Sequence, residues 1–417
     1  MDRSELAIEI KNLYKIYGLK PKLALDRLQS RGTHADDTGH LVALNDINLS
    51  IEAGKICVIM GLSGSGKSTL LRCINRLIDP TGGEIYIQGC EITQANKKEL
   101  RQIRLSKIGM VFQHFALLPH ISVLDNVAFG LRVAGVPRKE RRERAAQALQ
   151  LVGLGGWGDK KPSSLSGGMR QRVGLARALV MDTPILLMDE PFSALDPLIR
   201  EEMQQELLRL QSTLNKTIVF VTHDPNEAAT LGNRIAILLK GQVVQYGTPL
   251  EIVMSPANEY VRDFIRGTDV FKVLSAGQIV DPTRTPVVLA EGAVTALPLS
   301  RPTVAGPVAV TDPAGRLLGV VEKPSVLGTS SADWSRMLSQ DFIQVSPDQL
   351  IAPLLDELAR NQRPLVVVRE DNTLVGIVTG ASVLKALAAN SGSKGKLTEA
   401  VVQIATEPVV VAGQRVG

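Results

Sequence analysis

A glycine-rich segment in the first quarter of the chain has the residue types and spacing that bind phosphate. It follows the apolar run Ile56–Met60 and consists of Gly61, Leu62, Ser63, Gly64, Ser65, Gly66, Lys67, Ser68 and Thr69. The order G-x-x-x-x-G-K-[ST] is a P-loop when it joins a strand to a helix. Glycines let the backbone wrap closely around an anion, and free amides at a helix start favour negative charge. A glycine-rich turn before an ordinary helix is the alternative interpretation.

Two side chains of this segment indicate which phosphate compound would bind. Lys67 is expected to reach β- and γ-phosphates, and the Ser68 hydroxyl is expected to ligate Mg²⁺. The segment alone therefore predicts a nucleoside triphosphate with Mg²⁺.

Three further apolar runs end in polar residues suited to hydrolysis. Asp189 and Glu190 follow one run, His223 follows another, and Gln113 follows a third. We expect Asp189 to hold Mg²⁺ directly or through water, and Glu190 to accept the proton of the attacking water. His223 would position that water and the γ-phosphate, and Gln113 would ligate Mg²⁺ and register the phosphate. Taken alone, an acid pair is often a strand-end cap, and a single histidine is often a satisfied polar group.

Strands that alternate with helices must position these residues. Such alternation indicates a mainly parallel α/β sheet, and ligands of such sheets lie beyond the carboxyl ends of the strands. Gly61 and the four polar residues all fall at such ends. The pattern predicts strands over 6–13, 42–51, 84–89, 108–113, 183–189 and 217–222, helices over 69–76, 138–150 and 166–180, a hairpin over 234–247, and a closing helical segment over 248–266.

Length and composition indicate a globular protein of two or three domains. The chain has 417 residues, of which 44% are hydrophobic and 21% charged. A net charge of +5 suits a phosphate ligand, anionic lipid or nucleic acid, but no basic face with interleaved aromatics is present. The basic run over 138–144 contains acids, which favours a solvated helix over a nucleic-acid patch.

Cysteine usage and hydropathy bear on the compartment. Cys57, Cys73 and Cys90 show no metal-ligand spacing, which predicts a reduced, cytosolic protein. There is no signal peptide, and no apolar run approaches the roughly 18 residues of a membrane span. We therefore expect any membrane role to be peripheral and to act through a partner.

The composition shifts after Gly267, and the remainder contains an internal duplication. The matched segments are DPAGRLLGVV at 312–321 and EDNTLVGIV at 370–378. The second unit is also expected to contain helices around 354–358 and over 381–388. The predicted domains are 1–267, 268–330 and 331–390, followed by a tail over 391–417.

The ordered motifs of residues 6–266 resemble an ABC transporter ATPase. LSGGMRQ at 165–171, LLMDEP at 186–191 and SALD at 193–196 join the P-loop, Gln113 and His223 in this resemblance. The Ser-Gly-Gly signature is specific, because other P-loop enzymes lack it. The resemblance implies an α/β P-loop NTPase with an antiparallel β subdomain and a helical subdomain, and a competent ATPase that uses ATP and Mg²⁺.

The same resemblance implies a homodimer whose two copies meet head to tail. Each ATP would then lie between one P-loop and the signature of the partner. The residues expected to act in trans are Ser166, Gly167, Gly168, Met169 and Gln171, with Asp196 near the dimer seam. Tyr17 matches the aromatic residue that stacks on adenine, and Tyr14 is the alternative.

Within that family, the chain is more similar to the ATPases of glycine betaine/proline (quaternary amine) importers. The polar insertion after Tyr17, the segments 58–66, 110–120 and 192–200, and a C-terminal pair that resembles α+β tandem CBS domains carry this similarity. It implies integral membrane permease subunits and a periplasmic or surface substrate-binding protein as partners. It also implies a place on the cytoplasmic face of the plasma membrane, and glycine betaine, choline, carnitine or proline as solute.

The C-terminal pair departs from nucleotide-binding CBS units. The usual acidic residue after Gly-Ile-Val-Thr is absent, because the chain continues Gly380-Ala-Ser-Val. Sensing of ionic strength, of anionic lipid or of a small ligand, and a packing or electrostatic role, all stay open for this region.

Two other functions are compatible with an ABC ATPase. An importer ATPase for another substrate is one, and a cytosolic ABC ATPase acting on nucleic acid is a second. The latter class typically has two ATPase units or long coiled-coil arms, and this chain has one unit and no long heptad run. An exporter half would need membrane spans.

Overall fold

The computed structural model describes most of the chain, in two units. The described residues are 5–31, 40–113, 116–266, 268, 273–280, 287–290, 293–295, 307–321, 336–355, 363–380 and 382–383. One unit spans Met1–Thr268 and the other Asp269–Gly417. Within the described residues, no helix combines the length and the hydropathy needed to cross a membrane.

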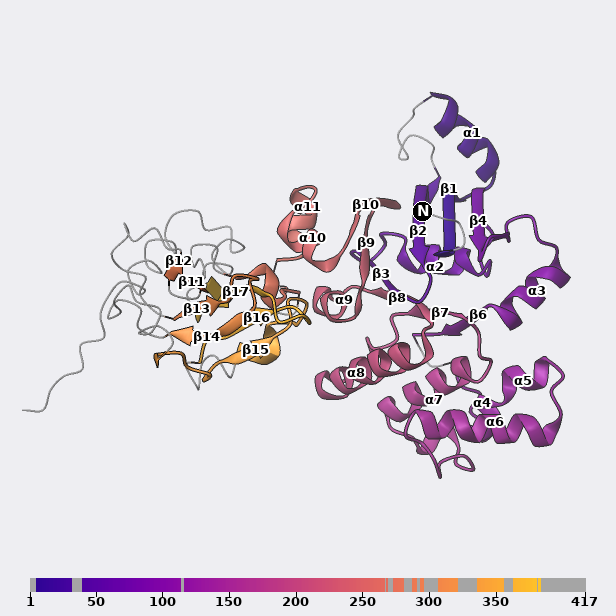
Figure 1. The fold of residues 1–417 in the computed structure, drawn as a ribbon. Coiled ribbons are helices and arrows are strands. Elements are labelled where there is room, and N and C mark those ends of the chain that lie inside the picture. Colours follow the sequence, from indigo (N-terminus) through magenta and orange to yellow (C-terminus); the bar gives the residue numbers. More distant parts are fainter. Residues whose placement is uncertain are drawn as a thin grey trace, which may run out of the picture. The chain divides into compact units, whose positions relative to one another are not determined.

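A six-stranded sheet forms the centre of the first unit (Figure 1). Its order is β10-β9-β3-β8-β7-β6, and every neighbouring pair is parallel except β10 with β9. The strands are β3 (Ile56–Met60), β6 (Ile108–Val111), β7 (Ile185–Asp189), β8 (Thr217–Thr222), β9 (Arg234–Leu239) and β10 (Gln242–Gly247). The predicted mainly parallel α/β sheet and the hairpin over 234–247 are confirmed.

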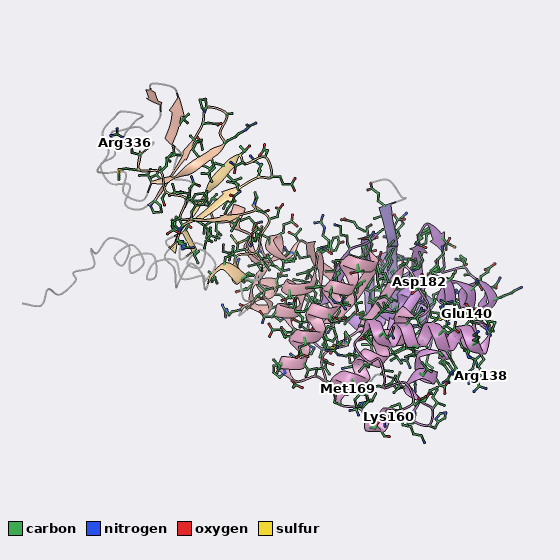
Figure 2. All side chains as sticks on the ribbon, turned by 60° about the horizontal axis from the view of Figure 1, so that its bottom comes forward. Arg138, Glu140, Lys160, Met169, Asp182 and Arg336 are labelled. Atoms are coloured by element: carbon green, nitrogen blue, oxygen red, sulfur yellow. The ribbon has the colours of Figure 1, made fainter. Side chains whose placement is uncertain are left out.

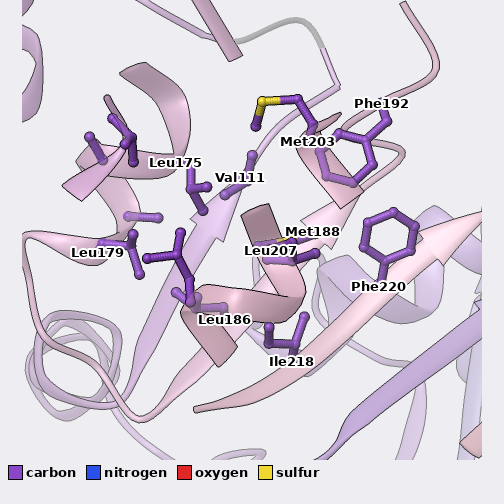
Figure 3. Packing of buried hydrophobic residues seen from close by; sticks show 14 of the residues in the cluster. Val111, Leu175, Leu179, Leu186, Met188, Phe192, Met203, Leu207, Ile218 and Phe220 are labelled. Carbon is purple, nitrogen blue, oxygen red and sulfur yellow. The ribbon is translucent and has the colours of Figure 1, made fainter. Parts of the chain in front are cut away.

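Both faces of this sheet are buried, because its apolar strands supply two separate cores. Val58 of β3 packs with Phe220 of β8 in one core, whereas the adjacent Ile59 and Val221 belong to the other. Successive side chains of a strand point to opposite faces, so a continuous apolar run fills both. Figure 3 shows part of the first core, where Phe192 and Phe220 lie with ring centroids 5.4 Å apart.

A second, antiparallel sheet covers the other core. Its order is β2-β1-β4-β5, formed by β1 (Leu6–Tyr17), β2 (Leu41–Glu52), β4 (Gly82–Ile87) and β5 (Cys90–Glu91). The polar insertion between β1 and β2 contains α1 (Pro21–Arg31), which buries Ala24 and Leu25 against Ile16. The antiparallel β subdomain expected from the resemblance is therefore present.

A group of helices covers the first core and forms the helical subdomain (Figure 1). It comprises α4 (Val123–Val127), α5 (Phe129–Val133), α6 (Arg138–Leu151) and α7 (Gly167–Leu179), with α8 (Pro197–Leu214) next to α7. On α6, Arg144 pairs with Glu140 at 3.5 Å and Arg142 pairs with Asp125 of α4 at 3.6 Å. Within the basic run, Glu140 thus pairs with Arg144 at i,i+4, as expected for a solvated helix face.

The remaining helices of the first unit differ in detail from their predicted bounds. They are α2 (Lys67–Ile74), α3 (Lys97–Ser106), α9 (Pro225–Leu231), α10 (Pro249–Met254) and α11 (Glu259–Phe264). Helix α2 begins at Lys67 rather than at residue 69. The closing segment is two helices rather than one, because Pro256 lies between them and Asn258 caps the second.

The second unit contains two hairpins built alike, as the internal duplication predicts. One joins β13 (Val308–Thr311) to β14 (Leu317–Val321), and the other joins β16 (Leu365–Val368) to β17 (Leu374–Val378). Each has one register shift, next to its turn. A bridge between Arg316 and Thr373 joins the two hairpin turns.

Shorter elements complete the described part of this unit. They are β11 (Val287–Ala290), β12 (Ala293–Thr295) and β15 (Ile343–Val345), with short 3-10 turns at Ala276–Gln278 and Ala352–Leu354. Residues 356–358 of the helix predicted around 354–358 and most of the one predicted over 381–388 lie outside the described residues, as does the tail over 391–417.

Candidate functional site

The loop between β3 and α2 has backbone angles that require glycine. Gly61, Gly64 and Gly66 have φ values of 151°, 80° and 105°. A Cβ atom on Gly61 would lie 2.3 Å from the Leu238 carbonyl oxygen, and one on Gly66 would lie 2.6 Å from the Ala43 carbonyl oxygen. The loop is therefore closely fitted to its surroundings, and it leads directly into the first turn of α2. This is the strand–loop–helix context that a phosphate-binding P-loop requires.

The Lys67 side chain is folded back onto this loop. Its Nζ donates to the carbonyl oxygens of Gly61 and Leu62, at 2.9 and 3.0 Å. Burial lowers the pKa of Lys67, and the nearby Glu190 and Asp189 carboxylates oppose that shift. Two neutral carbonyl oxygens thus hold an ammonium group that a phosphate would bind more strongly, because phosphate oxygens carry negative charge.

Ser68 and Asp189 form an oxygen pair across the sheet edge. The Ser68 Oγ donates to Asp189 Oδ1 at 2.7 Å, and the Asp189 side chain is almost fully buried. The other carboxylate oxygen, Oδ2, lies 3.1 Å from Arg72 Nη2. A hydroxyl and a carboxylate oxygen in contact match the hard-oxygen preference of Mg²⁺.

No larger set of protein metal ligands accompanies this pair. Among the described residues, no three His, Cys, Asp or Glu side chains gather in a way that could hold a metal ion. A cation here would therefore complete its shell with phosphate oxygens and water, as Mg²⁺ commonly does at nucleotide sites.

Glu190 and His223 come together at the ends of β7 and β8. The His223 Nδ1 lies 3.2 Å from Glu190 Oε2, and the glutamate is more buried than the histidine. Glu190 has a left-handed φ of 44°, and its amide donates to the Val221 carbonyl oxygen at 3.1 Å. Such backbone angles are uncommon outside glycine and cluster at functional sites.

Gln113 is linked to Glu190 through hydrogen bonds of Ser193. Its Nε2 lies 3.4 Å from Ser193 Oγ, which donates to the Glu190 carbonyl oxygen at 3.0 Å. Residues 114 and 115, which follow Gln113, lie outside the described residues. The structure therefore brings the P-loop, Asp189, Glu190, His223 and Gln113 to one edge, as their positions after parallel strands predict.

The two candidate adenine-stacking residues differ in exposure. Tyr17, at the end of β1, is 38% exposed, and Lys15 Nζ lies 4.9 Å from its ring centroid. Tyr14 packs against Ile16, Ala24 and Leu25. Burial raises the pKa of the Tyr14 hydroxyl, and the nearby Asp46 carboxylate adds to that shift. Tyr17 is therefore the more accessible ring.

The signature residues lie apart from the P-loop of the same chain. Ser166 caps α7, and its Oγ accepts a hydrogen bond from the Met169 amide at 3.3 Å. Figure 1 draws α7 within the helical subdomain, whereas α2 lies beside the sheets. Figure 2 places Met169 at the periphery of the unit. Ser166 is exposed, at the start of a helix in the helical subdomain.

Asp196 lies close to the signature. It caps α8 by accepting from the Ile199 amide at 3.1 Å, and a Cβ atom on Gly168 would lie 2.6 Å from Ile199 Cγ2. Gln171 differs from its neighbours, because its side chain is 1% exposed and its Oε1 has no hydrogen-bond partner. The Gln171 side chain is therefore buried within its own chain in this structure, and its action in trans stays a prediction.

Three charged residues near the site were not anticipated from the sequence. They are Arg72, which pairs with Asp189, and the linked pair Arg200 and Glu227. Arg72 lies one helical turn after Ser68, so their spacing on the predicted helix could have placed the two side chains side by side. The partners of Arg200 depend on how α8 packs beside α9, which the sequence does not specify.

Comparisons with known proteins agree with this geometry. Residues 44–193 match the ABC transporter family model, and residues 334–389 match the CBS domain model. The chain is 45% identical over 400 residues to the glycine betaine/proline betaine transport system ATP-binding protein ProV of Salmonella typhimurium, covering 94% of this chain and 100% of ProV. It is 43% identical over 396 residues to the glycine betaine transport ATP-binding protein OpuAA of Bacillus subtilis, with 94% of each covered.

A solved structure is similar to a part of this chain. It is the dimeric structure of a post-hydrolysis state of the ATP-binding cassette MJ0796 bound to ADP and Pi. The TM-score is 0.50 at 38% identity, with 58% of this chain and 98% of that chain covered. The chain therefore belongs to the ABC transporter family as an ATPase, among the ATP-binding subunits of glycine betaine-type importers, and it has a C-terminal CBS domain.

Proposed function

We propose that this chain is the motor subunit of an importer and hydrolyses ATP at two sites formed by two copies of itself. The observation that carries the proposal is the bonded set at one sheet edge, in which Ser68 contacts Asp189 and His223 contacts Glu190. These contacts within one chain support roles for the four residues in binding and hydrolysis. The exposed signature serine would need a second chain to take part.

In this proposal the P-loop amides and Lys67 bind the phosphates of ATP. Lys67 would exchange the Gly61 and Leu62 carbonyl oxygens for β- and γ-phosphate oxygens. Ser68 and Asp189 would hold Mg²⁺, with Gln113 as a further candidate ligand, and Tyr17 would stack on adenine. Bound Mg²⁺ supplies neutralisation of phosphate charge.

Glu190 would act as the general base of hydrolysis. It would accept a proton from water as the water oxygen attacks the γ-phosphorus and the bond to the β-γ bridging oxygen breaks, which releases ADP and phosphate. His223, 3.2 Å from the Glu190 carboxylate, would orient the base and the γ-phosphate. The backbone link from Glu190 through Ser193 to Gln113 would report the state of the site to the loop that follows Gln113.

The second half of each site would come from the partner copy. Ser166, Gly167, Gly168 and Met169 would face the γ-phosphate of the other chain, with Asp196 at the seam. The dimeric state of the related cassette MJ0796 supports this arrangement. Two sites related by a two-fold axis close the assembly, so it stops at two copies. Because Gln171 is buried, we assign it to packing within its own subunit.

The transport partners and solute follow from the relatives. Their names describe transport of glycine betaine, proline betaine, carnitine and choline. We propose a solute of this quaternary amine class, integral permease subunits, a separate substrate-binding protein, and a place on the cytoplasmic face of the membrane. The second unit would regulate turnover through ionic strength, anionic lipid or a small ligand.

Co-purification with the permease subunits, followed by ATPase assays in liposomes, tests this function. Glycine betaine, choline, carnitine and proline would each be supplied with the binding protein at several salt concentrations. We expect one or more of these solutes to stimulate ATP hydrolysis and to accumulate in an ATP-dependent manner. Basal hydrolysis that no such solute changes would contradict the proposed solute class.

A further inference from the structure

A cluster of charged side chains contacts the residues on either side of His223, outside the nucleotide site. Its centre is Glu227 of α9, which is 6% exposed. The Thr222 hydroxyl donates to Glu227 Oε2, and Gln204 Nε2 of α8 lies 3.4 Å from Glu227 Oε1. Burial raises the pKa of this carboxyl, while the hydrogen bonds and Arg200 oppose that shift. The cluster therefore joins the end of β8 to helices α8 and α9.

Arg200 connects this cluster to the turn that contains Asp196. Its Nη2 donates to the Leu195 carbonyl oxygen at 3.1 Å, and its Nη1 lies 3.6 Å from Asp224 Oδ2. Its Nε is buried without a hydrogen-bond partner and lies 3.9 Å from Glu227 Oε1. One guanidinium group thus contacts the residue before Asp196 and the residue after His223.

The backbone on both sides of His223 is held by this network. The Thr222 hydroxyl accepts from the Asp224 amide at 3.0 Å, and Asp224 caps α9 by accepting from the Asn226 amide at 2.8 Å. Between these two residues, the His223 side chain is 60% exposed and lies 3.2 Å from Glu190. The direction of the imidazole therefore depends on how Thr222 and Asp224 are fixed.

We propose that Arg200 is a positioning residue that ties the 193–196 turn to the His223 segment and so aims the imidazole at Glu190. The inference rests on the proposed role of His223 in hydrolysis. Arginine suits this task because its planar fork can satisfy a carbonyl and a carboxylate at fixed angles, which a lysine ammonium cannot do. A partner that contacts the exposed Asp196 would press on the turn that Arg200 holds.

Steady-state kinetics of the full-length chain give the first test. Arg200→Met is expected to lower kcat about 10- to 100-fold, because a small misplacement of a reacting group costs up to about that factor. KM for ATP should change little, since Arg200 does not contact the P-loop residues. Arg200→Lys should fall between Arg200→Met and wild type, and it serves as the second variant if Arg200→Met does not fold. Unchanged kcat in both variants, together with an unmoved His223, would overturn the proposal.

A matched control lies on the same helix. Arg209 of α8 pairs with Glu206 at 2.6 Å, and the Arg209 side chain is 63% exposed. Arg209→Met removes the same charge from α8 and should leave kcat, KM and the unfolding temperature near wild type. An equal loss of kcat in Arg209→Met would show that α8 charge in general, rather than Arg200, sets turnover.

Histidine NMR separates positioning from turnover. The chain has five histidines, so ¹⁵N-histidine labelling gives few signals, and His223→Asn identifies the one of interest. Arg200→Met and Arg200→Lys should each shift the His223 ring nitrogens and leave the other four unchanged. Ring signals that stay at their wild-type positions would overturn the proposal whatever the kinetics show. A shifted His223 with wild-type kcat would uphold the positioning and instead contradict the role of His223 in hydrolysis.

Discussion

The carboxyl edge of the six-stranded sheet and the start of α7 hold the two halves of the motif set in different ways. At the sheet edge, residues 121 positions apart touch, since Ser68 donates to Asp189. At α7, the Ser166 hydroxyl bonds only locally among the described residues, by accepting from the Met169 amide three residues on. The groups proposed for hydrolysis are therefore brought together by the folding of one chain, whereas the signature serine is exposed. Variants of the two regions should fail in different ways.

The largest expected effect comes from the sheet edge. Glu190→Gln removes the proposed base but keeps the size of the side chain, so ATP should bind while hydrolysis falls about 10²- to 10⁴-fold. Phosphate release and retention of labelled ATP measure the two outcomes. Glu206→Gln, which changes an α8 acid that pairs with Arg209, is the control. Hydrolysis at the wild-type rate in Glu190→Gln would contradict the role of Glu190 as the general base.

A substitution at the signature should act on association instead. Ser166→Arg places a bulky cation at the exposed start of α7, where the partner's nucleotide would lie. A single chain should still bind ATP as wild type does, but hydrolysis should fall on the order of 100-fold, because an anion-stabilising contact is lost. Light scattering of Glu190→Gln with ATP should show a dimer, and Glu190→Gln/Ser166→Arg should stay a monomer. If both variants form dimers with ATP, the signature does not control association, and the proposed difference between the sheet edge and α7 is contradicted.

Tyr17 should have a smaller effect, confined to affinity. Loss of base stacking in Tyr17→Ala costs about 1 kcal/mol, which is roughly a fivefold weaker binding of ATP. Titration calorimetry would measure this, with Tyr14→Phe as a control for the more buried ring. An unchanged affinity for ATP in Tyr17→Ala would show that adenine does not stack on Tyr17 at the end of β1.

The smallest effect on chemistry should come from removing the second unit. A chain that ends after Thr268 keeps both the sheet edge and α7, so ATP binding and basal hydrolysis should stay within about twofold of the full chain. Its response to salt should change if residues 269–417 regulate turnover. Loss of ATP binding in a truncated chain that circular dichroism shows to be folded would contradict this division.

Much of the sheet edge was predictable because its strands are continuous apolar runs followed by polar residues. Asp189, Glu190 and His223 each follow such a run, and parallel strands bring those ends together. Contacts between helices were not predictable in this way. The Arg200 contacts with Asp224 and Glu227 depend on the rotation of α8 against α9, and burial of Gln171 depends on which face of α7 packs inward. The break between α10 and α11 at Pro256 had a local signal, which the prediction of one helical segment did not use.

Subunit complementation tests the central claim, which is that each site takes its P-loop from one copy and its signature from the other. Lys67→Ala and Ser166→Arg should each be nearly inactive alone. In a mixed dimer, the intact P-loop of one copy meets the intact signature of the other, so mixing them should restore up to about a quarter of wild-type hydrolysis. Differently tagged copies confirm that mixed dimers form. Mixed dimers as inactive as their parents would contradict the claim.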